Sequence, residues 1–416
     1  MNFDFKKLMT TRFLFTAGVE MQAVIMGWQM YLLTHDALHL GLIGLAEAVP
    51  ALGLAMFAGY IVDRTKPLKV YKWVLYVSLF SGLVVLVTQS TLVTLSSSSQ
   101  VIALYAASFI SGVARGFSQP AMFSIVPRIV SRNELPKASA WMSSIMQVAR
   151  IGGPAVGGIL LELGGDVTAV SFVVVLSLLV GVASLHLIQA DPASNPLARS
   201  STAHFKTELL SGAKFVFSHK LLFPALTLDM VSVLFGGVTA LLPIYVHEIL
   251  NVQGGGFGLL RASPAIGAAL VGFWMTKGKI REKAGAWLFA CVGAFGLCNL
   301  VFAVSKSYWL SFAALLLGGG FDSVSAIIRG SAVQLVSPDH MRGRIAAINA
   351  MFIGSSNELG EFESGVAAKF MGTVQSAVFG AVVCLVTVGT MFVVAPALRR
   401  LNLRELEETG DPTIAS

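Results

Sequence analysis

Residues 38–89 read LHLGLIGLAEAVPALGLAMFAGYIVDRTKPLKVYKWVLYVSLFSGLVVLVTQ, two long apolar runs separated by a short basic loop. An α-helix needs roughly 20 mostly apolar residues to cross the hydrocarbon core of a bilayer, and each run supplies them. The loop carries Arg64, Lys66 and Lys69. Because lysine and arginine collect in cytoplasmic loops, this stretch predicts two membrane-spanning helices joined inside the cell.

The same alternation continues through the chain. Twelve apolar runs occur, at residues 13–33, 38–61, 70–89, 101–126, 138–163, 167–188, 221–246, 256–276, 285–305, 309–336, 344–369 and 373–394. Most of the 29 lysines and arginines lie in the N-terminus, in every second gap and in the C-terminal tail. The exceptions are Lys306 and Lys369 in opposite gaps and Arg115, Arg150, Arg261 and Arg329 inside apolar runs. The pattern predicts an all-α membrane protein with twelve transmembrane helices and both termini in the cytoplasm.

Composition excludes most soluble classes of protein. Of the 416 residues, 55% are hydrophobic and only 12% are charged, and the mean hydropathy is +0.76. A soluble domain carries about 25% charged residues. The net charge of +7 comes largely from loops that would face anionic lipid headgroups, so we expect membrane lipids and no nucleic acid as partners. Cys291, Cys298 and Cys384 lie in apolar runs without metal-ligand spacing and are interpreted as core residues.

A polar stretch at residues 189–220 divides the chain into two halves. Its second part, FKTELLSGAKFVFSHK, is amphipathic and is expected on the membrane surface. We therefore expect a six-helix bundle at 1–188, a cytoplasmic linker at 189–220, a second six-helix bundle at 221–396 and a cytoplasmic tail at 397–416. The segments SRNELPKASAWMSS and SPDHMRGRIAAINA lie between the fourth and fifth runs of their halves, which predicts two pseudo-symmetric bundles.

The loop GYIVDRTKP places Gly59 at the end of the second run and Asp63 and Arg64 at its cytoplasmic mouth. An acid beside bases at a helix end can form a charge-assisted contact in one conformation and lose it in another. The loop resembles the G-x-x-x-D-R-x motif of the major facilitator superfamily, where it acts as a cytoplasmic gate between the bundles. The alternative is ordinary cytoplasmic charge, and the matching loop of the second half, KGKIREKAG, lacks the Gly–Asp–Arg spacing.

The fifth run contains ARIGGPAVGG, in which Gly153, Pro154, Gly157 and Gly158 resemble the G-P-x-x-G-G core of a motif of the superfamily's exporters. Glycines and a proline loosen a helix and let a neighbour approach closely, so this segment is a candidate hinge. The chain departs from the motif at Ala149, where a glycine is usual. Close helix packing without bending is the alternative interpretation.

Over nearly its whole length the chain resembles the enterobactin-exporter branch of the superfamily, which is related to drug-efflux proteins. The resemblance is carried by WQMYLLTHDALHLGLIGL, NELPKASAW, RIGGPAVGGILLELGG and MRGRIAAINAMFIGSSNELGEFESG. It implies proton-driven export of a small amphipathic molecule, siderophore or drug-like, across a bacterial inner membrane. Since one chain contains both bundles, we expect a monomer. Arg115 is similar to the arginine of a third motif, although RGFSQP replaces R-x-x-Q-G.

Ionisable side chains at membrane depth cost roughly 2.5–3.5 kcal/mol each on insertion scales, so they normally face water or a partner. In the first half Glu20 and Glu47 lie deep with Arg115 and Arg150, which makes internal pairing plausible and leaves the two acids as candidates for proton coupling. In the second half acids outnumber bases. The deep acids are Asp229, Asp322, Glu358 and Glu361, and the deep base is Arg261, with Arg329 expected near the cytoplasmic end.

This acid surplus predicts proton coupling, because an unpaired carboxylate in a low-dielectric site takes up a proton readily. Glu358 and Glu361 are three residues apart on one helix face and are the first candidates, followed by Asp322 and Asp229. Two alternatives remain open: the acids could be solvated near the outer surface, or could bind a cationic substrate.

Polar and aromatic side chains inside the apolar runs are candidates for the substrate cavity. They are Gln22, Trp28, Gln29, Trp141, Phe235, Tyr245, Asn349, Phe352 and Asn357. The chain has no phosphate-binding G-x-x-x-x-G-K-[ST] loop and no histidine cluster, so we expect no enzyme activity, cofactor or metal. Import, coupling to another ion, and a membrane scaffold or sensor that does not transport are the competing hypotheses.

Overall fold

The computed structural model describes residues 3–90, 95–131, 134–164, 166–188, 213–252, 254–275, 282–338 and 341–409. The described part of the chain is almost entirely helical and contains no strand, so the prediction of an all-α protein is confirmed. The predicted linker up to residue 212 and the tail from residue 410 lie outside the described residues.

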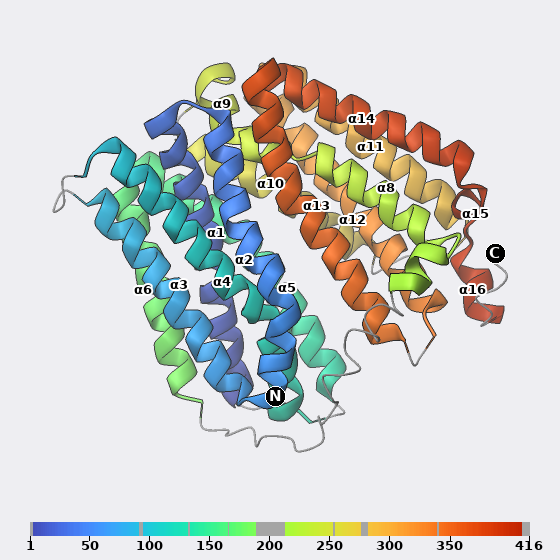
Figure 1. Cartoon of the computed structure of the whole chain (residues 1–416), viewed down its shortest axis with the longest axis horizontal. Helices are drawn as coiled ribbons and strands as arrows, with labels where there is room; N and C mark the ends of the chain where they lie inside the picture. The colour runs from blue at the N-terminus through green and yellow to red at the C-terminus, as the bar shows by residue number, and fades with distance from the viewer. Residues whose placement is uncertain are drawn as a thin grey trace. The chain divides into compact units, whose positions relative to one another are not determined.

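Six long helices form the first half of the chain (Figure 1): α1 (Phe3–Thr34), α2 (Ala37–Arg64), α3 (Pro67–Gln89), α4 (Ser97–Ile129), α5 (Leu135–Gly164) and α6 (Val167–His186). The second half contains α8 (Leu222–Phe235), α9 (Leu242–Ile244), α10 (Gly254–Met275), α11 (Ala284–Val304), α12 (Tyr308–Val336), α13 (Arg342–Met371) and α14 (Thr373–Val394). Two short helices follow, α15 (Pro396–Arg399) and α16 (Leu403–Thr409).

Ten helical segments of the described chain are long and apolar enough to cross a membrane. The two other long helices, α1 and α13, occupy the positions of the first and eleventh predicted spans. Polar side chains interrupt their apolar runs, among them Glu20 and Gln22 in α1 and Asn357 and Glu358 in α13. The helix order is therefore consistent with twelve spans.

The chain forms two compact units. Unit 1 comprises Met1–Ala198 and Ala240–Ala262, and unit 2 comprises Arg199–Thr239 and Ser263–Ser416. In unit 1, α2 and α3 pack on α4, while α5 and α6 pack on α1. A Cβ atom at Gly112 of α4 would overlap the main-chain carbonyl of Glu47 in α2, so the missing side chain permits this close packing.

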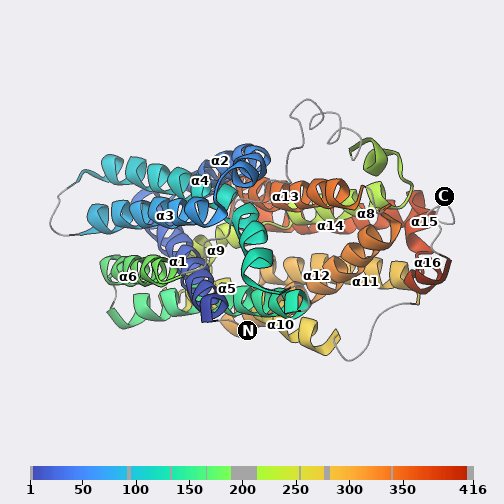
Figure 2. The ribbon, with the colours of Figure 1, turned by 90° about the horizontal axis from the view of Figure 1, so that it is seen from below.

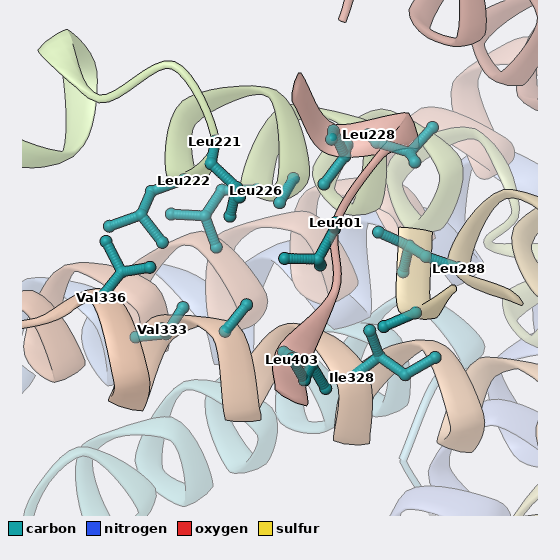
Figure 3. Packing of buried hydrophobic residues seen from close by; sticks show 14 of the residues in the cluster. Leu221, Leu222, Leu226, Leu228, Leu288, Ile328, Val333, Val336, Leu401 and Leu403 are labelled. Atoms are coloured by element: carbon teal, nitrogen blue, oxygen red, sulfur yellow. The ribbon is translucent and has the colours of Figure 1, made fainter. Parts of the chain in front are cut away.

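Unit 2 is held together by a cluster of buried leucine, isoleucine and valine side chains. Figure 2 shows α11 and α12 alongside one another, and α14 packs on both α11 and α8. Figure 3 shows Leu222 and Leu226 of α8 beside Val333 and Val336 of α12 within this cluster. Each fully buried side chain of this size contributes about 1.5–3 kcal/mol when it is removed from water. In a bilayer, where apolar surface is also covered by lipid, close packing supplies more of the stability.

The seventh predicted span is not one continuous helix. It ends as an α-helix at Phe235, is unwound at Gly236–Gly237, and resumes as a 3-10 helix over Val238–Leu241 and a π-helix over Tyr245–Ile249. Adjacent glycines lower the cost of leaving the helical conformation. Unwound backbone at membrane depth is tolerated only where protein buries it or a cavity hydrates it, so this break marks an internal site.

Candidate functional site

A cavity of about 280 Å³ lies within unit 2, beside the break in the seventh span. Its charged lining consists of Asp229 from α8, Asp322 and Arg329 from α12, and Glu361 from α13. The amides of Asn299 and Asn357 and the unwound Gly236–Gly237 backbone also line it. Three acids and one base therefore line one cavity.

Asp229 and Arg329 form an ion pair in the wall of this cavity. The two side chains are only 7% and 5% exposed, so water screens their attraction little. The sequence predicts Arg261 as the deep base of this half, whereas Arg329 is the base that pairs with Asp229. Removing one partner from such a pair leaves a buried, uncompensated charge.

Asp322 precedes Arg329 by seven residues, about two helical turns, so the two side chains share one face of α12. It interacts electrostatically with both Asp229 and Arg329. Among the described residues, its carboxylate forms no hydrogen bond and no ion pair within 4 Å. Because Arg329 can neutralise only one of the two aspartates, an ionised Asp322 gives the trio a net negative charge.

Only one member of the predicted Glu358 and Glu361 pair lines the cavity. Glu361 lines the cavity, while Glu358, also half-buried on α13, is not among the residues that line it. Both have interaction partners of their own. Asn357, one helical turn before Glu361, donates a hydrogen bond from Nδ2 to the Ile353 carbonyl at 2.7 Å.

The predicted ionisable residues of the first half lie together in unit 1. Arg115 Nη1 donates to Glu47 Oε1 at 2.8 Å, and Arg150 Nε lies 3.9 Å from Glu20 Oε1. Arg261, at the start of α10, belongs to the same unit and interacts electrostatically with Glu20. In this unit each deep acid has a basic neighbour.

The glycine–proline motif of α5 lies where α5 meets α1 and the start of α10. A Cβ at Gly153 would approach the Ala17 carbonyl to 2.8 Å, and one at Gly157 would contact Met21 at 3.5 Å. Gly258 of α10 packs against the backbone of Pro154 and Gly158. The small residues therefore permit close helix packing; whether α5 also bends there stays a prediction.

The C-terminal end of α1 holds the Ala240–Ala262 segment through aromatic and polar contacts. Tyr31 donates a hydrogen bond to Glu248 Oε1 at 2.6 Å, and its ring lies 5.4 Å from the His247 ring. Trp28, predicted for the substrate cavity, stacks on Phe257 with 5.6 Å between ring centroids. Tyr245, another such candidate, is completely buried in the π-helix.

The other substrate-cavity candidates are dispersed. Gln22 is buried and donates to Ser81 Oγ at 2.7 Å, which fits a packing role between α1 and α3. Phe235 packs on Phe379 and Phe352 on Phe217, with ring centroids 6.1 and 6.0 Å apart. Gln29 and Asn349 are half-buried and Trp141 is half-exposed. Of the nine candidates only Asn357 lines the unit 2 cavity.

The predicted gate lies at the end of α2. Gly59 borders open space, because no other side chain or backbone atom comes within 4 Å of a Cβ built there. Arg64 is exposed and has an interaction partner. The backbone of Asp63 continues the helix, while its side chain lies outside the described residues. The gating role remains a prediction.

Sequence reasoning missed three parts of the cavity: Arg329, Asn299 and the Gly236–Gly237 break. The break had a readable signal, since FGGVTALLP combines adjacent glycines with a proline inside an apolar run, and discontinuous spans commonly mark transport sites. Asn299 sits among apolar residues and carried no comparable pattern.

The helix bundle, the interrupted span and the buried charged cavity define a membrane transporter. The sequence model of a family described as transmembrane secretion effectors matches residues 2–414, and the chain belongs to that family, part of the major facilitator superfamily. The family consists of transporters, so the prediction that the chain is not an enzyme is confirmed.

Known relatives and structures agree with this assignment. The enterobactin exporters EntS of Shigella dysenteriae and of Escherichia coli are each 24% identical to this chain over 357 residues, covering 82% of this chain and 79% of theirs. A POT family transporter in complex with 5-aminolevulinic acid has a TM-score of 0.73 at 11% identity, covering 95% of this chain and 96% of its own. An inward-facing bacterial homologue of the iron transporter ferroportin has a TM-score of 0.71 at 14% identity, covering 96% and 100%. These structural likenesses show the fold.

Proposed function

We propose that this protein exports a siderophore, or a similar small amphipathic molecule, across a bacterial inner membrane in exchange for protons. The observation that carries the proposal is Asp322 beside the Asp229–Arg329 ion pair in the unit 2 cavity. The relatives named as enterobactin exporters support the direction and the substrate class. Both termini would lie in the cytoplasm and the working form would be a monomer.

The proton would be carried by the trio of Asp229, Asp322 and Arg329. Arg329 neutralises one aspartate, so a proton on Asp322 makes the trio neutral, which a buried site favours. The proton would bind when the cavity opens outward and leave when it opens to the cytoplasm. Protonation thereby biases a conformational equilibrium, as alternating access requires.

Alternating access also needs contacts that form on one side and break on the other. The Tyr31–Glu248 hydrogen bond and the Trp28–Phe257 stack, which hold the Ala240–Ala262 segment on α1, are suited to this on the outer side. The Gly59–Asp63–Arg64 loop would act on the cytoplasmic side. The α5 glycines would allow helices to slide between the two states.

The test is uptake into inside-out vesicles with an imposed pH gradient, using enterobactin, a hydroxamate siderophore, a macrolide and a cationic dye. Export appears as uptake driven by an acidic lumen. Asp322→Asn should lower gradient-driven uptake at least tenfold. Asp166→Asn, at the exposed N-cap of α6, is the matched control because asparagine also caps helices.

Each competing hypothesis predicts another outcome. Uptake driven by an alkaline lumen would indicate import, and uptake driven by sodium would indicate another coupling ion. Normal proton-driven uptake by Asp322→Asn together with loss in a Glu358→Gln/Glu361→Gln double variant would move the carrier to α13. A folded protein that takes up none of these compounds would favour a scaffold or sensor.

A further inference from the structure

Asn299 of α11 lines the unit 2 cavity and has a buried side-chain donor that forms no hydrogen bond within the described part of the chain. Its side chain is buried, with 3% of the residue exposed, and it lines the cavity. Nδ2 has no hydrogen-bond partner among the described residues. A buried donor without a partner costs about 1–3 kcal/mol, and folded proteins seldom retain one without a purpose.

The break in the seventh span brings the Gly236 backbone against this amide. A Cβ at Gly236 would lie 3.0 Å from Asn299 Nδ2 and 2.9 Å from the Phe295 ring. Any side chain at Gly236 would therefore crowd the amide or cover it. The unwound glycine thus allows Asn299 to pack against the break at the cavity wall.

Asp322 supplies the complementary group in the same cavity. An ionised carboxylate only accepts hydrogen bonds, whereas the Asn299 Nδ2 donates them. A ligand group that satisfies both must accept one hydrogen bond and donate another. A single uncharged hydroxyl does both with one oxygen atom.

Charged ligand groups fit this lining less well. A carboxylate or phenolate oxygen could accept from Asn299 but would face the acids Asp229, Asp322 and Glu361. An ammonium group could donate to Asp322 but could not accept from Asn299. A carboxylate or phenolate would leave Asp322 without a donor, and an ammonium group would leave the Asn299 donor without an acceptor.

We infer that Asn299 and Asp322 form a substrate subsite that binds an uncharged hydroxyl group of the exported molecule, as in an alcohol, a phenol or a hydroxamic acid. This inference rests on the proposed function, because it names the substrate chemistry of the same cavity. Hydrogen bonds to an ionised acceptor are roughly twice as strong as neutral ones. The substrate therefore binds best when Asp322 is unprotonated, so proton and substrate compete for one carboxylate.

The inference can be tested with two probes that differ by one hydroxyl, benzohydroxamic acid and its O-methyl ester. Binding to the purified full-length protein is measured by titration calorimetry. The wild type should prefer the hydroxamic acid, and Asn299→Leu, which is similar in size, should lower that affinity at least tenfold. The affinity for the O-methyl ester should stay unchanged. Asn299→Ser retains a hydroxyl donor and should lose less.

Thermal stability provides the control for folding. Asn299→Leu removes an unpaired buried donor, so its melting temperature should equal or exceed that of the wild type. Equal loss of affinity for both probes, no loss for either, or no preference in the wild type would overturn the subsite.

Siderophore transport measured on the same variants separates the two proposals. Selective hydroxamic acid binding without any siderophore transport would overturn the proposed function and leave the subsite standing. Siderophore export that is unaffected by Asn299→Leu would overturn the subsite alone.

Discussion

In unit 1, Glu47 lies 2.8 Å from Arg115 and Glu20 lies 3.9 Å from Arg150, so each deep acid has its own basic neighbour. In the cavity of unit 2, Arg329 pairs with Asp229, and Asp322 is a second aspartate that interacts with both at longer range. The two units also differ in how exposed their arginine side chains are. The arginines of unit 1 are 43% and 54% exposed at their side chains, against 5% for Arg329.

This contrast assigns different physical roles to similar residues. A paired and partly hydrated charge is tolerated at little cost and need not change during transport. An odd carboxylate beside a buried ion pair creates a state whose charge depends on one proton. We therefore propose that the coupling chemistry lies in unit 2 and that the charges of unit 1 have a scaffolding role.

Replacement of Arg329 by methionine should have the largest effect on stability. It would leave Asp229 buried near Asp322 with no counter-charge from the described residues, at a cost of about 3–5 kcal/mol. Thermal unfolding in detergent measures this as a large fall in the melting temperature of the variant.

The double variant Arg329→Met/Asp229→Asn sharpens the same comparison. Removing both charges of the ion pair should recover most of the lost stability, because Asp229 no longer carries a buried charge without its partner and only Asp322 of the trio stays acidic. A double variant as unstable as the single one would show that Arg329 acts by filling space. A single variant as stable as the wild type would mean that Asp229 is already protonated in the folded protein.

Replacement of Arg115 by methionine should have an intermediate effect. Glu47 is 11% exposed at its side chain and would lose a charge-assisted hydrogen bond worth about 1.5–3 kcal/mol. The Arg115 side chain is 43% exposed, so water already screens the pair and we expect the lower end of that range. The same unfolding measurement on Arg115→Met and Arg329→Met ranks the two units directly. A larger loss of stability for Arg115→Met than for Arg329→Met would reverse this contrast between the two units.

The fold was predictable because the signals for membrane helices are local. The run predicted at 373–394 is helix α14 (Thr373–Val394), and the run at 309–336 is α12 (Tyr308–Val336). Length and hydropathy decide such segments without reference to the rest of the chain. The seventh span differed because glycine is common in membrane helices, and only the cavity beside Gly236–Gly237 makes unwinding tolerable.

The residue types of the site could be predicted from the sequence, but most of the contacts between them could not. The acid surplus of the second half indicated Asp229, Asp322 and Glu361, all of which line the cavity. The partner of Asp229 lies one hundred residues away on another helix, so no local pattern could identify Arg329. Asn299 can be recognised as a site residue only because Gly236 packs against it. The sequence does not show that packing.

The weakest ion pair, Glu20 with Arg150, gives the most sensitive test of the contrast between the two units. Glu20 and Arg150 lie 3.9 Å apart with side chains that are 33% and 54% exposed, so their interaction is long and hydrated. Exposed pairs contribute about 0.2–1 kcal/mol, and Arg261 remains near Glu20 when Arg150 is lost. Arg150→Gln should therefore change the melting temperature little and should leave proton-driven uptake within about twofold of the wild type. If Arg150→Gln instead abolished uptake while the protein stayed folded, a charge of unit 1 would take part in coupling, and the odd carboxylate of unit 2 could not be the sole proton carrier.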